Sequence, residues 1–279
     1  SEREIRSKAL DDIFGKIKKS GIGNRNTSST GLGDEVLPEL RSYNFGDRIE
    51  QIDFASSIKN AQQRGLGKDF ILREEDLEVR ETSHQSQLAT VMMIDISHSM
   101  ILYGEDRITP AKKVALALAE FIGRVYPKDS LDIVVFGNDA WQVQLKDLPY
   151  LQVGPFHTNT VAGLELAMEI LRKKKTANRQ IFMITDGKPT CLKEGDHYYK
   201  NSMGHDPKII SKCINLAVKA RKSRIPITTF MIANDPYLEQ FVEEFTQANK
   251  GRAFYSGLNG LGDMVFADYE KNKRRNTRF

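Results

Sequence analysis

The sequence predicts an α/β fold: a doubly wound, mainly parallel sheet with helices on both faces, preceded by an N-terminal helix and a β-containing extension. Three observations predict it. Continuous apolar runs, typical of parallel strands buried on both faces, recur through the last two thirds of the chain. Apolar residues at helical spacing follow most of these runs. Expected strands and helices alternate from residue 88 to residue 270, and this alternation predicts a parallel sheet covered by helices on both faces.

Composition divides the chain into three parts. Residues 1–85 begin with an expected amphipathic helix over residues 2–19, followed by a Gly/Ser/Asn-rich linker and a mixed extension in which DFILREEDLEVRE has extended character. Residues 86–270 hold the alternating domain. Residues 271–279 form a basic tail. We expect this tail to be solvated, and contact with RNA, an acidic membrane or an acidic partner is the alternative.

The expected strands are short apolar runs bounded by polar residues. They are LATVMMID (88–95), LDIVVFG (131–137), AWQVQL (140–145), RQIFMIT (179–185), PITTFMIA (226–233) and GRAFYS (251–256).

The expected helices have an apolar stripe and recognisable starts. Thr109 is a suitable N-cap and Pro110 a suitable first residue for the first helix. Asp235 and Pro236 cap a later helix in the same way. The other helices are VAGLELAMEILRKK (161–174), PKIISKCINLAVKARK (207–222) and a last one around Leu261–Tyr269. A polar loop is expected between residues 186 and 207.

Composition sets limits on function. A net charge of +4 over 279 residues is too small to indicate nucleic-acid binding by itself. No apolar stretch approaches the roughly 18 residues that span a bilayer. Of the two cysteines, Cys213 falls on an apolar helix face and Cys191 in the polar loop; a disulfide between them stays open, but they are no disulfide framework. A cytoplasmic location is expected.

Polar side chains gather where the expected strands end. Asp95 ends the first apolar run, and the following Asp-Ile-Ser-His-Ser places Ser97 and Ser99 on the same side as Asp95. Asp186 follows a later strand, and HTNTVAGL (157–164) brings hydroxyls just before a helix. Ligands of open α/β sheets bind beyond the carboxyl ends of the strands. Three loops are therefore expected to present two carboxylates and several hydroxyls at one edge.

Hard oxygen ligands of this kind suit Mg²⁺, with Ca²⁺ or Mn²⁺ also possible. Hydroxyl ligands do not neutralise the ion, so it keeps affinity for one more carboxylate supplied by a partner. The alternative is that Asp95 caps a strand, Ser97 and Ser99 are ordinary turn residues, and Asp186-Gly187 is a plain turn.

The pattern resembles the metal-ion-dependent adhesion site of von Willebrand factor type A (VWA) domains. D-x-S-x-S after a buried strand, T-x-T-x-x-G-L, and I-T-D-G after a later strand match its three parts. The resemblance implies that Ser97 and Ser99 bind the metal directly, and that Thr158 does so when a ligand is bound. Asp95 and Asp186 would act largely through water. Thr160 is the alternative to Thr158.

The segment before this domain resembles bacterial VWA proteins encoded beside MoxR-type AAA+ ATPases. YNFGDRIEQIDFASSIKN (43–60) and FILREEDLEVRE (70–81) carry the resemblance. Matching positions are Tyr43, Gly46, Asp47, Ile52, Asp53, Arg73 and Glu75. Phe54 stands where Trp is commoner, and the N-terminal helix has no counterpart in that pattern. The resemblance implies a protein-interaction module that docks on the ATPase or its client.

Other functions are weighed against this one. Extracellular metal-dependent adhesion is an alternative within the same family. A phosphatase-like hydrolase is disfavoured, because Ser97 stands where such enzymes carry a second Asp as acid/base. The chain has no G-x-x-x-x-G-K-[ST] loop and is expected to have no nucleotide site of that kind. His98 and His157 flank the expected ligands, and His98 is expected to face away from the ion.

Overall fold

The computed structural model describes residues 40–44, 49, 52–64, 71–80, 87–203, 205–255 and 260–276. Chain contacts divide it into two units, residues 24–85 and the remainder. The helix expected over residues 2–19 lies outside the described residues. Among the described helices, none is long and apolar enough to cross a membrane.

The larger unit is built on a six-stranded sheet with the order β10-β9-β6-β3-β4-β5. All neighbouring pairs are parallel except β4 and β5, which form an antiparallel edge. The strands are β3 (Leu88–Asp95), β4 (Ser130–Phe136), β5 (Ala140–Val143), β6 (Asn178–Thr185), β9 (Ile227–Met231) and β10 (Arg252–Tyr255). The expected α/β fold is confirmed.

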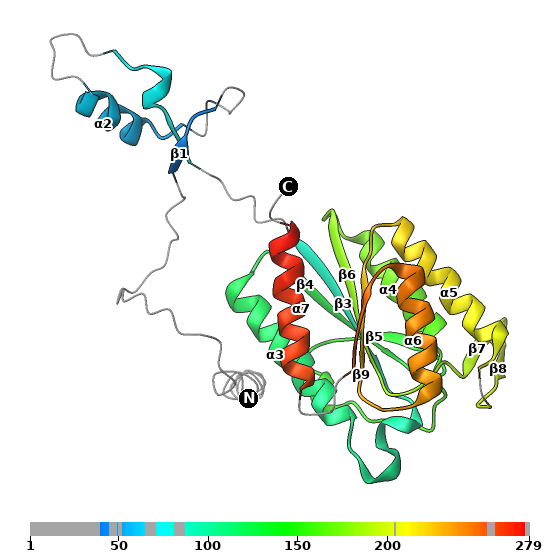
Figure 1. Cartoon of the computed structure of the whole chain (residues 1–279). Coiled ribbons are helices and arrows are strands. Elements are labelled where there is room, and N and C mark those ends of the chain that lie inside the picture. Colours follow the sequence, from blue (N-terminus) through cyan, green and yellow to red (C-terminus); the bar gives the residue numbers. More distant parts are fainter. Residues whose placement is uncertain are drawn as a thin grey trace. The chain divides into compact units, whose positions relative to one another are not determined.

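Five of the described helices cover the two faces of the sheet, as Figure 1 shows. They are α3 (Ile108–Val125), α4 (Thr160–Lys173), α5 (Pro207–Lys222), α6 (Pro236–Asn249) and α7 (Leu261–Asn276). Met92 and Ile94 of β3 pack into the core formed with α3 and α7. Val91 and Met93 alternate with them and pack into the core formed with α4, α5 and α6. Because a strand turns alternate side chains to opposite faces, a strand covered on both faces is apolar throughout, and this is why β3 is a continuous apolar run.

Two details differ from the sequence-based expectations, and a third, the state of the two cysteines, was left open by the sequence. The segment expected as a polar loop contains a hairpin, β7 (Cys191–Glu194) and β8 (His197–Lys200), whose Cys191 is buried. Both cysteines are free. Helix α3 begins at Ile108, one residue before the expected N-cap, because the carboxylate of Asp106 accepts the Thr109 N–H (3.0 Å).

The last helix is longer than expected. Helix α7 continues to Asn276, and Lys273 is buried with its ammonium 2.6 Å from the carboxylate of Asp129. The expectation of a solvated tail is therefore wrong at this position. The ion pair joins residues 144 positions apart, so local composition could not indicate it.

The smaller unit holds a two-stranded antiparallel sheet of β1 (Leu40–Ser42) and β2 (Glu78–Arg80), with α2 (Phe54–Arg64) and the short helix η3 (Glu74–Asp76). Helix α2 was not predicted. Asp53 begins it by accepting the Ser56 N–H (3.0 Å), and Ser57 accepts the N–H of Glu78 (2.9 Å). This second bond ties the helix to β2.

Candidate metal centre

Asp95 is the last residue of the central strand β3 and is fully buried. One carboxylate oxygen accepts the backbone N–H of Ser97 (2.8 Å), and the other accepts the hydroxyl of Thr185 at the end of β6 (2.7 Å). The carboxylate therefore joins the ends of two neighbouring strands and shapes the turn that follows the first.

That turn separates apolar from polar side chains. Ile96 and Met100 are buried in the core beneath it. Ser97 and Ser99 point to the sheet edge, where their hydroxyl oxygens are 3.0 Å apart, and Ser99 donates to a carboxylate oxygen of Asp186 (2.7 Å). His98 is exposed, so it is not placed among these groups. The alternation expected from the sequence is confirmed in its geometry.

Thr158 comes from the loop before α4 and is buried. A Cβ built on Gly187 would lie 3.6 Å from its hydroxyl oxygen and 3.3 Å from that of Ser99. The missing side chain of Gly187 thus leaves space facing both hydroxyls. Thr158 lines the same cavity as the two serines, whereas Thr160, the alternative, does not line it.

Asp186 has a partner that the sequence did not indicate. The guanidinium of Arg107, just before α3, forms an ion pair with its outer carboxylate oxygen (2.9 Å), and Glu105 binds the same guanidinium (2.9 Å). The Asp186 side chain is fully buried, and that of Arg107 is 13% exposed. Arg107 and Asp186 are 79 positions apart in the sequence, so no local sequence pattern could indicate that they pair. The available signal was an arginine at the start of the helix that follows the serine turn.

Asp95 and Asp186 both have raised pKa values. Burial, and after it the negative charge of Asp186, raise the pKa of Asp95 to about 7. Burial also raises the pKa of Asp186, although the hydrogen bond from Ser99 and the charge of Arg107 act in the opposite direction. A buried carboxylate whose pKa rises lacks sufficient compensating positive charge. The site therefore has the electrostatic character of one that takes up a cation.

The donor set fits a hard divalent ion. Ser97, Ser99, Thr158 and Asp186 line part of a cavity of about 640 Å³, and Asp95 lies behind them. Thr190, Ser202 and Asp235 line other parts of the same cavity. Within the described ranges, no three His, Cys, Asp or Glu side chains come together as a metal cage. The site would have to use neutral hydroxyl oxygens, which suit Mg²⁺, Ca²⁺ or Mn²⁺.

Comparisons with known proteins place this domain in a family. Residues 88–270 match the vWA domain of the Rv0959-like proteins, and residues 35–82 match the third domain of the same proteins. The chain belongs to the Rv0959-like family. Its VWA domain is the larger unit described above.

Relatives in this family include Rv0959 of Mycobacterium tuberculosis and Mb0984 of Mycobacterium bovis. Each is 30% identical over 282 residues, which cover 98% of this chain and 41% of the relative. This Rv0959-like chain thus spans about two fifths of the length of these relatives.

Solved structures share the fold of the VWA domain. A D319A mutant of the PilB minor pilin from Streptococcus sanguinis has a TM-score of 0.59 at 12% identity and covers 72% of this chain and 65% of its own. The vWF domain of the pili tip protein Mfa5 from Porphyromonas gingivalis has a TM-score of 0.56 at 13% identity and covers 70% and 97%. At these identities the likeness shows the fold alone.

Proposed function

We propose that this chain is a non-enzymatic, Mg²⁺-dependent protein-interaction module. Ser97, Ser99 and Thr158 would hold the ion with Asp95 and Asp186 behind them, and the ion would bind an Asp or Glu carboxylate of a partner protein. The observation that carries the proposal is the convergence of these hydroxyls and the two buried carboxylates on one cavity.

The charge balance of the site supports docking rather than a closed structural site. An ion whose direct ligands are neutral hydroxyls, with the two carboxylates behind them, keeps affinity for one more anion. Lys188 lines the same cavity, so an incoming carboxylate would meet one further positive charge, whereas Arg107 is already paired with Asp186 and Glu105. Lys188 also stacks over the ring of Tyr237, 4.4 Å from its centre, which holds its ammonium near the rim.

We further propose that the partner is a MoxR-type AAA+ ATPase or its client. This proposal rests on the resemblance of residues 43–60 and 70–81 to the segment that precedes the domain in the VWA partners of those ATPases. ATP hydrolysis would take place on the partner.

Metal binding is tested first, by calorimetric titration of Mg²⁺ into metal-free protein. Wild type should bind one ion, and the double variant S97A/S99A should bind none in the same range. The matched control S211A/S223A removes two exposed serine hydroxyls elsewhere and should bind as wild type does. Equal binding by S97A/S99A and wild type would refute the site.

Partner capture is tested next, from native cell lysate with Mg²⁺ or with EDTA. We expect an AAA+ ATPase, identified by mass spectrometry, to be retained only by wild type in Mg²⁺. If wild type and S97A/S99A retain the same ATPase in EDTA, docking does not use the metal. If metal binds but no ATPase is retained, the MoxR assignment fails while the metal-dependent module stands.

A further inference from the structure

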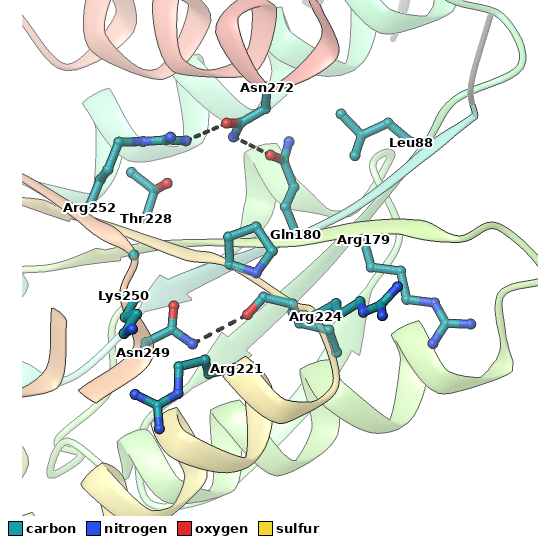
Figure 2. A pocket seen from close by; sticks show the side chains of 13 residues that line it. Leu88, Arg179, Gln180, Arg221, Arg224, Thr228, Asn249, Lys250, Arg252 and Asn272 are labelled. Carbon is teal, nitrogen blue, oxygen red and sulfur yellow. Dashed lines mark hydrogen bonds between the residues drawn. The ribbon is translucent and has the colours of Figure 1, made fainter. Parts of the chain in front are cut away.

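A second hollow, drawn in Figure 2, lies at the end of the sheet where the parallel strands begin. It has a volume of about 350 Å³ and lies among the starts of β6, β9 and β10 and the ends of α5 and α6. The candidate metal centre lies where β3 and β6 end. The two sites are therefore on opposite sides of the fold, and nothing in the proposed function uses this one.

The lining of this hollow is strongly basic. It contains five cationic side chains and no Asp or Glu: Arg179, Arg221, Arg224, Lys250 and Arg252. Arg252 is neutralised by the buried Asp268 (2.6 Å). In the part of the chain that the structure describes, the other four have no ion pair with a carboxylate within 4 Å. Of these four, Arg179 donates to the carbonyl oxygens of Lys174 (2.9 Å) and Thr176 (3.0 Å). Among the described residues, Arg221, Arg224 and Lys250 thus remain as three uncompensated positive charges around one concavity.

Two of these cations occupy positions whose left-handed backbone conformation favours glycine. Arg224 has φ +57° and Lys250 φ +58°, and they are the two non-glycine residues with positive φ among those described. Lys250 directly follows α6, and Arg224 follows α5 after one residue, Ser223; both lie where a left-handed glycine commonly ends a helix. A side chain there costs roughly 1 kcal/mol or more. This backbone strain occurs at two separate turns, and both turns place a cation at this hollow.

The connections that carry these cations are held rigidly. The buried Asn249 donates to the carbonyl oxygens of Ala217 (3.0 Å) and Ile225 (3.3 Å), and its own oxygen accepts the Ile227 N–H (2.8 Å). One amide thus fixes the end of α5, the start of β9 and the end of α6. Figure 2 shows Arg221 and Lys250 beside this amide.

The opposite wall is a buried polar network. Asn272 of α7 donates to the side-chain oxygen of Gln180, whose amide donates to Thr90 (2.9 Å). Arg252 binds Asn272, and Thr228 donates to Asp268 (2.9 Å). Because each of these side chains has a hydrogen-bond or ion-pair partner within the wall, the wall is preorganised.

We propose that this hollow binds the phosphate group of a small molecule, with Arg221, Arg224 and Lys250 as its contacts. Guanidinium groups match phosphate oxygens through paired, charge-assisted hydrogen bonds. A hollow of about 350 Å³ accommodates a phosphate or diphosphate with part of the molecule that carries it. A concave site of this size takes a terminal group rather than a continuous nucleic-acid backbone.

The test uses inorganic pyrophosphate as the probe, titrated calorimetrically into the full chain in metal-free buffer. The variant R224G/K250G removes two cations and relieves the left-handed backbone at both positions, so it should fold with an unchanged or higher melting temperature. Its affinity for pyrophosphate should fall at least about tenfold. The control R172A/K222A removes two exposed cations outside the hollow and should stay within about twofold of wild type.

Three outcomes of the calorimetric titration would overturn the proposal. They are no binding of pyrophosphate by wild type at millimolar concentration, unchanged affinity in R224G/K250G, and an equal loss in the control R172A/K222A. The last outcome would mean that net charge alone attracts the anion. Binding of a short single-stranded RNA without competition by pyrophosphate would also contradict it, since the cations would then serve a polymer.

Discussion

Asp95→Asn tests the electrostatic strain of the metal centre directly. The asparagine has the shape of aspartate and can keep both contacts of residue 95. Its oxygen can accept the Ser97 N–H, and its NH₂ can donate to the hydroxyl of Thr185. That hydroxyl also reaches the carbonyl oxygen of Gly187 (3.0 Å), to which it can donate instead. The substitution therefore removes the buried charge and leaves no orphaned partner.

The expected size follows from the pKa of Asp95, which burial and the charge of Asp186 raise from 3.8 to about 7. A carboxyl whose pKa is higher in the folded protein binds more protons there than in the unfolded chain, so stability falls as pH rises from about 4 to about 7. The full effect is on the order of 4 kcal/mol. We expect D95N to be more stable than metal-free wild type at pH 7.5, and the difference to shrink toward pH 4.

The assay is urea and thermal unfolding of metal-free protein at several pH values between 4 and 7.5. A difference of this size corresponds to a melting-temperature shift on the order of 10 °C in a domain of about 200 residues. Mg²⁺ should reverse the order, because it stabilises wild type by mass action and D95N much less. A D95N protein that is less stable than wild type at pH 7.5, with no dependence on pH, would refute the reasoning.

Asp139→Asn is the matched control, because it should behave with the opposite sign. Hydrogen bonds from Tyr198 and Lys193 hold the pKa of Asp139 below its ordinary value. Its contribution is present at neutral pH and is lost as pH falls through the folded pKa. D139N should therefore be slightly less stable at pH 7.5, and the deficit should disappear in acid.

Three further predictions concern the same domain. Arg107→Gln removes the counter-charge of Asp186, so metal-free protein should lose about 1–3 kcal/mol in urea unfolding; calorimetry should show tighter Mg²⁺ binding, and unchanged affinity would contradict competition between guanidinium and ion. Gly187→Ala places a methyl against Ser99 and should weaken Mg²⁺ about tenfold in the same titration, with melting temperature nearly unchanged. Phe182→Ala empties a fully buried position and should cost about 3–5 kcal/mol in urea unfolding without affecting Mg²⁺ affinity.

The sheet could be predicted because the apolar composition of its strands indicates that they are buried on both faces. Residues 91–94 and 181–184 are apolar on both alternating sets, and only a strand covered on both faces requires that. Elements held by distant polar contacts were missed. Helix α2 depends on Ser57 meeting Glu78, and the end of α7 depends on Lys273 meeting Asp129. Such pairs leave no periodic signal.

The candidate metal centre was predictable for a related reason. Asp95 and Asp186 end strands that neighbour each other, so the topology alone brings them to one edge. The structure places Ser97, Ser99 and Thr158 around the same cavity, and metal binding by these residues stays a prediction. From the sequence we expect Thr158 at the site, with Thr160 as the alternative; Thr158 lines the cavity, whereas Thr160 is the first residue of α4 and does not line it.

The two proposed sites differ in sign and lie along one strand. Gln180 and Thr185 are five residues apart on β6, so the polar wall of the basic hollow and the metal centre are separated by about 17 Å. That is about twice the distance over which physiological salt screens charges. Direct attraction between an ion at one site and an anion at the other is therefore weak. If Mg²⁺ and pyrophosphate change each other's affinity, the coupling has to run through movement of packed elements, and α7 is the first candidate because Asn272 binds Gln180.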